Sequence, residues 1–415
     1  MKQNRAVLSV LACYLACVYY AKRRRRSYMQ RKVDEALQAR HSRCTASGDA
    51  PKGSVWRVHN LITALDLEFE SWWSMSSRGL FLTYAIPTIS SVLYKTGGFE
   101  RETARRYADM ELLIREFNEN AVDGTEVIND DMVVNFAGQP ERAKRALQRV
   151  NAIHQQYKSM ITYNDMVYTW SVFACTPARW MESRWSVRPL SAGEKECIYF
   201  HWLDIGRLLN LQVDKQFRNW DEIMAFKTAY ETKHMRPTKS NAVVASSTID
   251  YFIDGFFQYQ WMRALSRPLV FQVMSCLQEN STHAEALGLP PANPVLYAVI
   301  DAFLTMRALV WRYLVPPAPA FTQDRLTAKE ATSFTMGKGC PMTKNLYYPA
   351  RALDFNNTTY KPLACPVVKR QQLGATPLDQ APDGGYALED MGPPSVRKGW
   401  LCEKPVYLGH PPESE

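Results

Sequence analysis

The sequence has few histidines and no close cysteine pairs outside its N-terminal region. Only seven of the 415 residues are histidine, and the nine cysteines include no Cys-x-x-Cys. A small disulfide scaffold and a cysteine-rich zinc site both need such pairs, so the sequence argues against both. Reduced thiols facing a cytosol-like compartment are the simpler interpretation.

Several catalytic motifs are also missing. The chain lacks Gly-x-Ser-x-Gly, both Gly-rich phosphate loops and His-Glu-x-x-His, which removes support for serine hydrolases, P-loop or Rossmann enzymes and zinc proteases. A carboxylate-bridged di-iron bundle needs two Glu-x-x-His pairs, and only Glu231 to His234 is present. The segment Phe334–Cys340 has the wrong spacing for a thiolate-haem monooxygenase and lacks the usual Arg.

Acidic residues are scarce only in the N-terminal region, so most of the net charge of +9 is located there. Residues 1–50 contain 11 basic and 3 acidic side chains, whereas the remainder contains 39 and 38. A nucleic-acid groove requires basic residues across the folded body, and this body is nearly neutral. Nucleic-acid binding is therefore excluded.

One apolar run precedes the basic cluster. Ala6–Ala21 is uncharged and is followed by Lys22–Arg26. Its 16 residues would span about 24 Å as a helix, slightly less than the ~30 Å hydrocarbon core. Because the stronger charge follows the run, an uncleaved membrane anchor over residues 1–27 is favoured over a signal peptide or a buried helix. The positive-inside rule then predicts that the rest of the chain is cytosolic. A mean hydropathy of −0.31 excludes a multi-spanning protein.

The rest of the chain divides by composition. Residues 28–55 are polar and predict a tether, and residues 56–315 show helical periodicity with few strand-like runs. Residues 316–415 contain 14 of the 24 prolines and predict an irregular arm and tail. The expected architecture is all-α, with a single helical domain between an N-terminal anchor and a Pro-rich C-terminal arm.

A helical stripe turns one histidine inward. His154 shares this stripe with Ala146, Leu147, Val150, Ile153 and Tyr157. It is either a core histidine bound to a carbonyl or an axial ligand, because a neutral imidazole in an apolar pocket suits a haem iron. Tyr157, one turn further on, either lines such a pocket or packs in the core.

A second stripe contains an arginine. Arg106 lies with Met110, Leu113 and Phe117, and Asp109 is beside them. A buried Arg is costly unless it is paired. It either forms an ion pair with Asp109 or Glu102, or it holds an anionic cofactor group such as a haem propionate.

These helices are part of an ordered series of short segments. The series comprises Thr83–Ser90, Arg106–Phe117, Val150–Tyr157, Asn164–Phe173, Arg179-Trp180, Arg188–Leu190, Tyr230-Glu231, Met235–Pro237 and Gly385–Pro393. In order and spacing it resembles the fungal ER-bound MpaB-type oxygenases, which share their catalytic domain with the bacterial rubber oxygenases (latex-clearing proteins). The likeness runs intermittently from about residue 75 to 315, with the tail segment beyond.

The resemblance implies a globin-like core that binds haem b, with His154 as the proximal iron ligand and Arg106 close to the haem. Met110 stands where the family has Thr, so a hydroxyl is lost. Asp109 stands where the rubber oxygenases have a distal Lys, so a lysine-ligated iron is not implied. The expected catalytic residues are Arg106 and Asp109, and the expected haem-binding residues are His154, Arg106, Met110 and Tyr157.

The implied activity is O₂-dependent cleavage of a C=C bond in an isoprenoid or other lipophilic substrate, at the endoplasmic reticulum membrane. Two alternatives stay open: a non-catalytic tethered protein that binds lipid or a partner, and a haem monooxygenase that hydroxylates. His201 is the reserve axial candidate, and Asn164 and Asp165 are expected to cap the following helix. The expected partners are a lipophilic small molecule, O₂ and the membrane, with no nucleic acid and with protein partners unknown.

Overall fold

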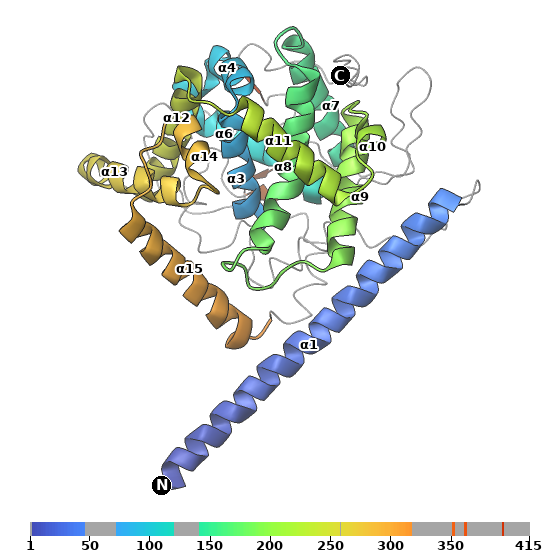
Figure 1. Cartoon of the computed structure of the whole chain (residues 1–415), viewed down its shortest axis with the longest axis vertical. Coiled ribbons are helices and arrows are strands. Elements are labelled where there is room, and N and C mark those ends of the chain that lie inside the picture. Colours follow the sequence, from blue (N-terminus) through green and yellow to red (C-terminus); the bar gives the residue numbers. More distant parts are fainter. Residues whose placement is uncertain are drawn as a thin grey trace.

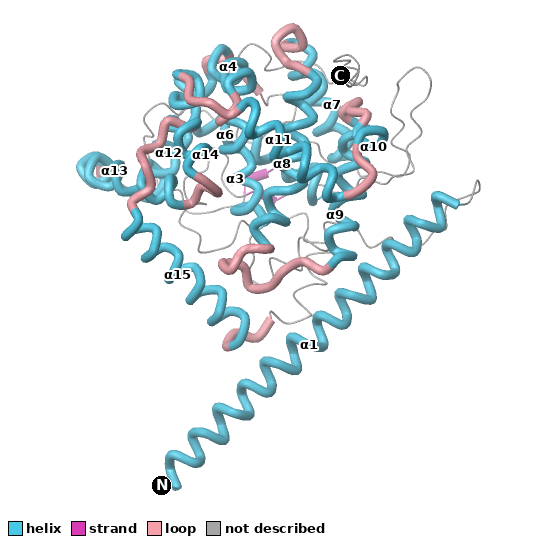
Figure 2. The backbone as a smooth tube through the Cα atoms, viewed as in Figure 1, coloured by secondary structure: helices cyan, strands magenta, loops and turns pink. Residues whose placement is uncertain are grey.

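The structure, a computed structural model, describes residues 2–45, 72–119, 141–257, 259–317, 351–352, 361–362 and 392–393. Helices make up nearly all the regular structure in these ranges (Figure 1, Figure 2). The exception is an antiparallel pair of two-residue strands, β1 (Arg351–Ala352) and β2 (Lys361–Pro362). The predicted all-α fold class is confirmed for this part of the chain. The domain boundaries stay predictions, and most of the predicted C-terminal arm lies outside the described residues.

The N-terminal helix α1 (Lys2–Thr45) is continuous and extends far from the body in Figure 1. Most of the described side chains in its first half are exposed, with Val18 buried, whereas Met29, Val33 and Ala36 are buried in its second half. These three side chains, spaced four and three residues apart, form an apolar stripe in a polar stretch, and this part of α1 packs against α9 (Ala192–Leu208). The structure is thus helical over residues 28–45 and docks on α9 around Met29–Ala36, whereas the sequence predicts a polar tether over residues 28–55.

In the part of the chain that the structure describes, two helices are long and apolar enough to cross a membrane: α1, over Ala6–Gln38, and α15 (Pro294–Tyr313). Only the first was predicted from the sequence. Just 6% of each apolar window is buried in the protein, so neither is an ordinary core helix.

The centre of the body is α8 (Tyr163–Met181), whose residues are almost all buried. Thr162 caps it by accepting a hydrogen bond from the Asp165 backbone N–H at 3.1 Å. The helix packs against α3 (Trp72–Tyr84), α11 (Trp220–His234) and α9. The other helices of this part of the body are α4 (Pro87–Lys95), α5 (Gly98–Arg101), α6 (Thr103–Glu119), α7 (Glu141–Gln156), α10 (Val213–Gln216) and α12 (Lys239–Phe256).

Two further helices, α13 (Gln260–Cys276) and α14 (Ser281–Ala286), lie between α12 and α15. α13 packs against both α12 and α15. In Figure 1 these elements form one side of the molecule, and α15 runs from there toward α1.

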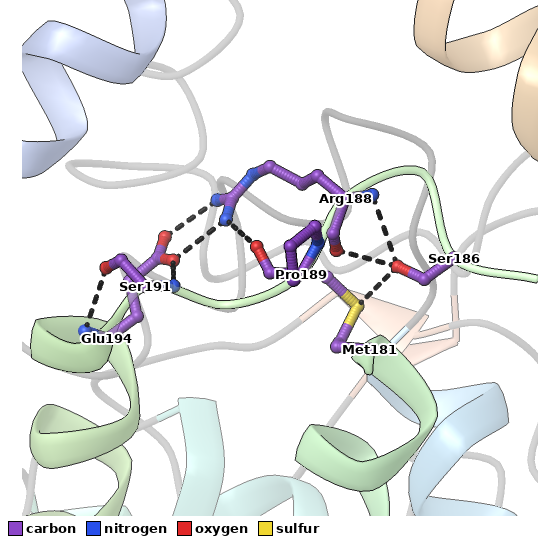
Figure 3. Close-up of polar contacts among 6 residues, drawn as sticks. All are labelled: Met181, Ser186, Arg188, Pro189, Ser191 and Glu194. Carbon is purple, nitrogen blue, oxygen red and sulfur yellow. Dashed lines mark hydrogen bonds and ion pairs between the residues drawn. The ribbon is translucent and has the colours of Figure 1, made fainter. Parts of the chain in front are cut away.

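The loop between α8 and α9 is fixed by a buried ion pair (Figure 3). Arg188 donates to both carboxylate oxygens of Glu194, at 2.8 and 2.7 Å. Ser191 and Glu194 also form a capping box at the start of α9. Burial disfavours the charge of Glu194, but the hydrogen bonds and charge of Arg188 outweigh burial and lower the pKa of Glu194. The loop therefore has one defined conformation.

Candidate functional site

A cavity lies between α3, α4, α6, α7, α8 and α9. Most of its wall is apolar, with side chains such as Leu80, Leu93, Met166 and Phe173. The polar side chains on the wall, among the residues that the structure describes, are Thr83, Tyr84, Thr88, Thr96, Arg106, His154, Tyr157, Asp165 and Thr169. An apolar cavity with a few converging polar groups is the usual form of a small-molecule site.

α7 brings His154 to this cavity. The helix buries Ala146, Leu147 and Ile153 against the core, and the same stripe directs His154 onto the cavity wall near the C-terminal end of the helix. The ring is enclosed by the protein, and the surface it retains faces the cavity. Placement of His154 inward, predicted from periodicity, agrees with the structure.

The protonation state of His154 follows from its surroundings. Burial, reinforced by the charge of Arg106, lowers the pKa of His154 to about 4. At neutral pH the imidazole is therefore uncharged and keeps a nitrogen lone pair. It is the one histidine on this wall among the described residues.

α6 supplies Arg106 and Met110, and both line the cavity. Arg106 is 7% exposed. Gly98 of α5 allows this close packing, because a Cβ atom there would lie 3.3 Å from the Arg106 Cδ atom. The guanidinium is near enough to lower the pKa of both His154 and Tyr84, although burial raises the pKa of Tyr84 overall. One buried cation and one neutral imidazole thus share the same apolar cavity.

Asp109 is on the same helix, but it is absent from the cavity wall. Its side chain is fully buried, and its Oδ2 atom accepts a hydrogen bond from the Gly392 backbone N–H at 2.9 Å. The next residue, Pro393, lines the cavity. Asp109 therefore fastens a C-terminal segment against the site, and the catalytic role expected for it stays a prediction.

Tyr157 follows α7 and also lines the cavity. Its backbone N–H donates to the His154 carbonyl at 3.0 Å, which closes the last turn of the helix. The reserve candidate His201 is buried on α9 but does not line the cavity, whereas its neighbour Trp202 does. The structure thus brings Arg106, Met110, His154 and Tyr157 together and leaves His201 apart.

The Asp165 carboxylate accepts hydrogen bonds from several hydroxyl groups, and the sequence did not predict this role. The donors are Thr88 at 2.7 Å, Thr162 at 2.7 Å and Tyr230 at 2.8 Å. The helix cap itself is Thr162, so the expectation that Asn164 and Asp165 cap α8 is corrected. Thr88 and Tyr230 are 77 and 65 residues away from Asp165, and no local pattern indicates such distant partners.

A second buried network extends from this one. Tyr230 stacks on Tyr168 with the ring centroids 4.9 Å apart. Tyr168 donates to Glu231 at 3.1 Å, and Lys227 forms an ion pair with Glu231 at 2.8 Å. Burial raises the pKa of the Tyr168 phenol, so it remains protonated. These residues hold α8 and α11 together behind the cavity.

Comparison with known proteins tests the resemblance. Residues 128–319 match the family model described as "ER-bound oxygenase mpaB/B'/Rubber oxygenase, catalytic domain". This region is therefore similar to the catalytic domain of that oxygenase family. It includes His154 and α8 to α15, whereas Arg106, Asp109 and Met110 precede it.

Three fungal oxygenases are similar to this chain. The ER-bound oxygenase mpaB' of Penicillium brevicompactum is 30% identical over 270 residues, which are 61% of this chain and 58% of that protein. The ER-bound oxygenase mpaB of the same species is 28% identical, with 61% and 56% covered. The mpaB of Penicillium roqueforti (strain FM164) is 32% identical over 177 residues, with 39% and 53% covered. The match therefore spans little more than half the length of each of these relatives.

Proposed function

We propose that this protein is a membrane-anchored, haem-b-dependent oxygenase. The observation that carries the proposal is the pairing of neutral His154 with buried Arg106 on one apolar cavity wall. The oxygenase names of the family and of the relatives support the reaction class.

The donor set fits a haem. A porphyrin supplies four ligands to its iron, so the protein needs to add only one or two. A single uncharged imidazole on the wall suits that need, and His154 would hold the iron. Among the described residues no group of three or more His, Cys, Asp or Glu side chains gathers as a metal site.

Arg106 would bind an anionic group. Its guanidinium lies on the wall of a mostly apolar cavity, and its planar donors suit bidentate hydrogen bonding to an anionic group such as a haem propionate. Met110, one turn along α6, offers no hydroxyl at the position of the family Thr. A hydrogen bond from that position is therefore not part of the proposed chemistry.

The apolar wall has a separate role. When bound, haem iron supplies O₂ binding and redox chemistry. The cavity residues exclude bulk water and select an apolar substrate, while Asp165, on the wall, fixes the hydroxyl group of Thr88, which also lines the cavity. The proposed reaction is oxidative cleavage of a C=C bond in an isoprenoid or similar lipophilic side chain.

The proposed location is the endoplasmic reticulum membrane. The relatives are named ER-bound, and α1 carries an exposed apolar segment followed by Lys22–Arg26. The positive-inside rule places the body in the cytosol with α1 as the anchor.

The test is the visible spectrum of the full-length protein in detergent. The wild-type protein and a His201→Ala variant should both show a haem Soret band, whereas His154→Ala should lose it. Because His201 is buried on α9 outside the cavity, it controls for general loss of a buried imidazole. A wild-type protein that purifies without haem after expression with haem supplementation would contradict the proposal.

The reaction itself needs a second measurement. Hydroxylation stays open as an alternative to cleavage, because one scaffold can carry several chemistries. Incubation of the haem-loaded protein with a polyprenyl substrate under ¹⁸O₂, with and without an added electron donor, distinguishes them, because hydroxylation consumes two electrons and cleavage into two carbonyls consumes none. Cleavage yields two shorter labelled carbonyl products, whereas hydroxylation yields one product of unchanged chain length.

A further inference from the structure

Large exposed apolar side chains gather on one side of the body. Apart from those on α1, every one found among the described residues lies between the end of α12 and the end of α15. On α13 and just before it they are Phe256, Tyr259, Trp261, Leu265 and Leu269; on and just after α15 they are Val295, Tyr297, Val299, Phe303, Met306, Leu309, Val310, Tyr313 and Leu314. We call these side chains the α13–α15 face.

The spacing within the face is helical. On α13, Trp261, Leu265 and Leu269 recur every four residues. On α15 the exposed positions 295, 299, 303, 306, 310 and 313 recur every three or four residues along the whole helix. α13 and α15 pack against each other, so their stripes form a continuous surface. Contiguous apolar surface of this kind is rare on soluble monomers and marks a membrane or protein contact.

Two charged side chains of α13 form ion pairs with the neighbouring helix α12. Arg263 forms an ion pair with Asp254 of α12 at 3.0 Å, and Arg267 forms one with Asp250 at 2.7 Å.

Charged side chains of α15 are bound by the α8–α9 loop. Asp301 accepts from the Trp185 indole at 2.8 Å and also pairs with Arg184. Arg312 donates to the carbonyls of Val187 and Ser186, at 2.7 and 3.0 Å. Among the described residues, the charged side chains named here are paired away from the apolar stripes of the two helices, although Arg267 stays half exposed. Stripes without charged side chains suit hydrocarbon better than water.

α15 also meets the membrane anchor. Tyr14, in the apolar run of α1, donates to the carbonyl of Leu314 at 2.7 Å, and Lys22 donates to the carbonyl of Trp311 at 2.9 Å. The C-terminal end of α15 thus lies beside the second half of the apolar run, between Tyr14 and the first residue of the basic cluster, Lys22. If α1 crosses the bilayer, this end of α15 lies in the headgroup-side half of the hydrocarbon.

The direction of α15 relative to α1 indicates whether α15 lies along the membrane surface or crosses the membrane. In Figure 1, α15 runs across the direction of α1. Its 20 residues are long enough to span, at about 1.5 Å each. However, its hydrogen bonds to Trp185, Ser186 and Val187 attach one side of it to the body along most of its length. A helix with one apolar side and one side bound to a polar body lies in the membrane surface.

We propose that the α13–α15 face is a second membrane contact, beside α1. It inserts into the leaflet on the same side of the membrane as the folded body. The occupant is the lipid bilayer, because the face continues the exposed apolar surface of the anchor and carries interfacial aromatics such as Trp261 and Tyr259. The basic cluster of α1 lies where it can meet the headgroups. This proposal is independent of haem and of the reaction.

The experiment uses the full-length protein in vesicles of phosphatidylcholine and phosphatidylserine. The photocrosslinker benzoylphenylalanine is introduced in separate variants at Phe303 and Trp261 of the face, and at Thr232 as a control. Thr232 is exposed on α11, so the same anchor holds it near the membrane but outside the proposed contact. After illumination, intact-protein mass spectrometry identifies the adducts.

Lipid adducts at positions 303 and 261, with none at 232, are expected. A covalent dimer at 303 would assign the face to a second copy of the chain and overturn the proposal. Absence of lipid adducts from both face positions, or equal adducts at all three, would overturn it as well. Each variant replaces an exposed side chain, so the fold should be retained. Circular dichroism verifies this for each variant.

Discussion

At the residue scale, the ion pair between Arg188 and Glu194 is the most sharply defined interaction of the α8–α9 loop. The two side chains are 11% and 4% exposed. Arg188→Met leaves a buried carboxylate without its partner and should lower the free energy of unfolding by about 3–5 kcal/mol. Urea denaturation measures this change. The double variant Arg188→Met/Glu194→Met is the control, and it should lie much closer to wild type, because no unpaired charge remains.

The same pair predicts a pH dependence. The pKa of Glu194 is lower in the folded protein than its ordinary value of 4.5. Its stabilisation is therefore complete above that ordinary pKa and is lost as the pH falls through the lower, folded pKa. Urea denaturation curves can be recorded at roughly pH 6 to pH 3. The free energy of unfolding of the wild-type protein should decrease as the pH falls, and that of Glu194→Gln should decrease less. Equal decreases would contradict this assignment.

Asp109 allows a structural role to be separated from a catalytic one. Asp109→Ala removes the acceptor for the Gly392 N–H and should cost about 1–3 kcal/mol by leaving that group unpaired. Haem content and kcat should change little, whereas amide hydrogen exchange at Gly392 should rise. A large fall in kcat with unchanged exchange would instead support the catalytic role predicted from the sequence.

At the element scale, the docking of α1 on α9 depends on Gly193. A Cβ atom at this position would lie 2.6 Å from a methyl group of Val33. Gly193→Ala should therefore push α1 outward and cost about 1–3 kcal/mol, despite the better helix propensity of Ala. Hydrogen exchange across residues 29–36 reports the displacement.

A matched second change tests the cause. Val33→Ala removes the methyl groups that a Gly193→Ala side chain would strike, so the double variant should recover protection of α1 relative to Gly193→Ala alone. The coupling between the two positions is the quantity of interest. Additive effects would mean that the two residues do not touch in solution.

Features that depend on residues close together in the sequence could be predicted, whereas features that depend on contacts between distant segments could not. The inward placement of His154 was predictable because a helical stripe is local information. The docked part of α1 was also encoded locally, by Met29, Val33 and Ala36, but the surrounding charges concealed it. Periodicity does not reveal whether an apolar stripe faces the core or the solvent, so the exposed face of α15 could not be distinguished from a core-facing one.

At the scale of the whole molecule, the cavity combines residues from distant parts of the chain. Arg106 and His154 come from α6 and α7, and Pro393 comes from the C-terminal region. Sequence patterns identified Arg106, Met110, His154 and Tyr157 separately. The hydroxyl network around Asp165 depends on tertiary packing of α4, α8 and α11, and no pattern in any one of them predicts it.

The continuity of α1 has a consequence for encounters with substrate. Its 44 residues make a rod about 66 Å long, and the rod is attached to α9 at one end of the body. The body therefore cannot rotate relative to α1 as it would on a flexible chain. If α1 anchors the protein in the bilayer as proposed, a lipophilic substrate diffusing within the bilayer would meet the same side of the protein at every collision. The search for the cavity would then take place in two dimensions with the orientation already fixed.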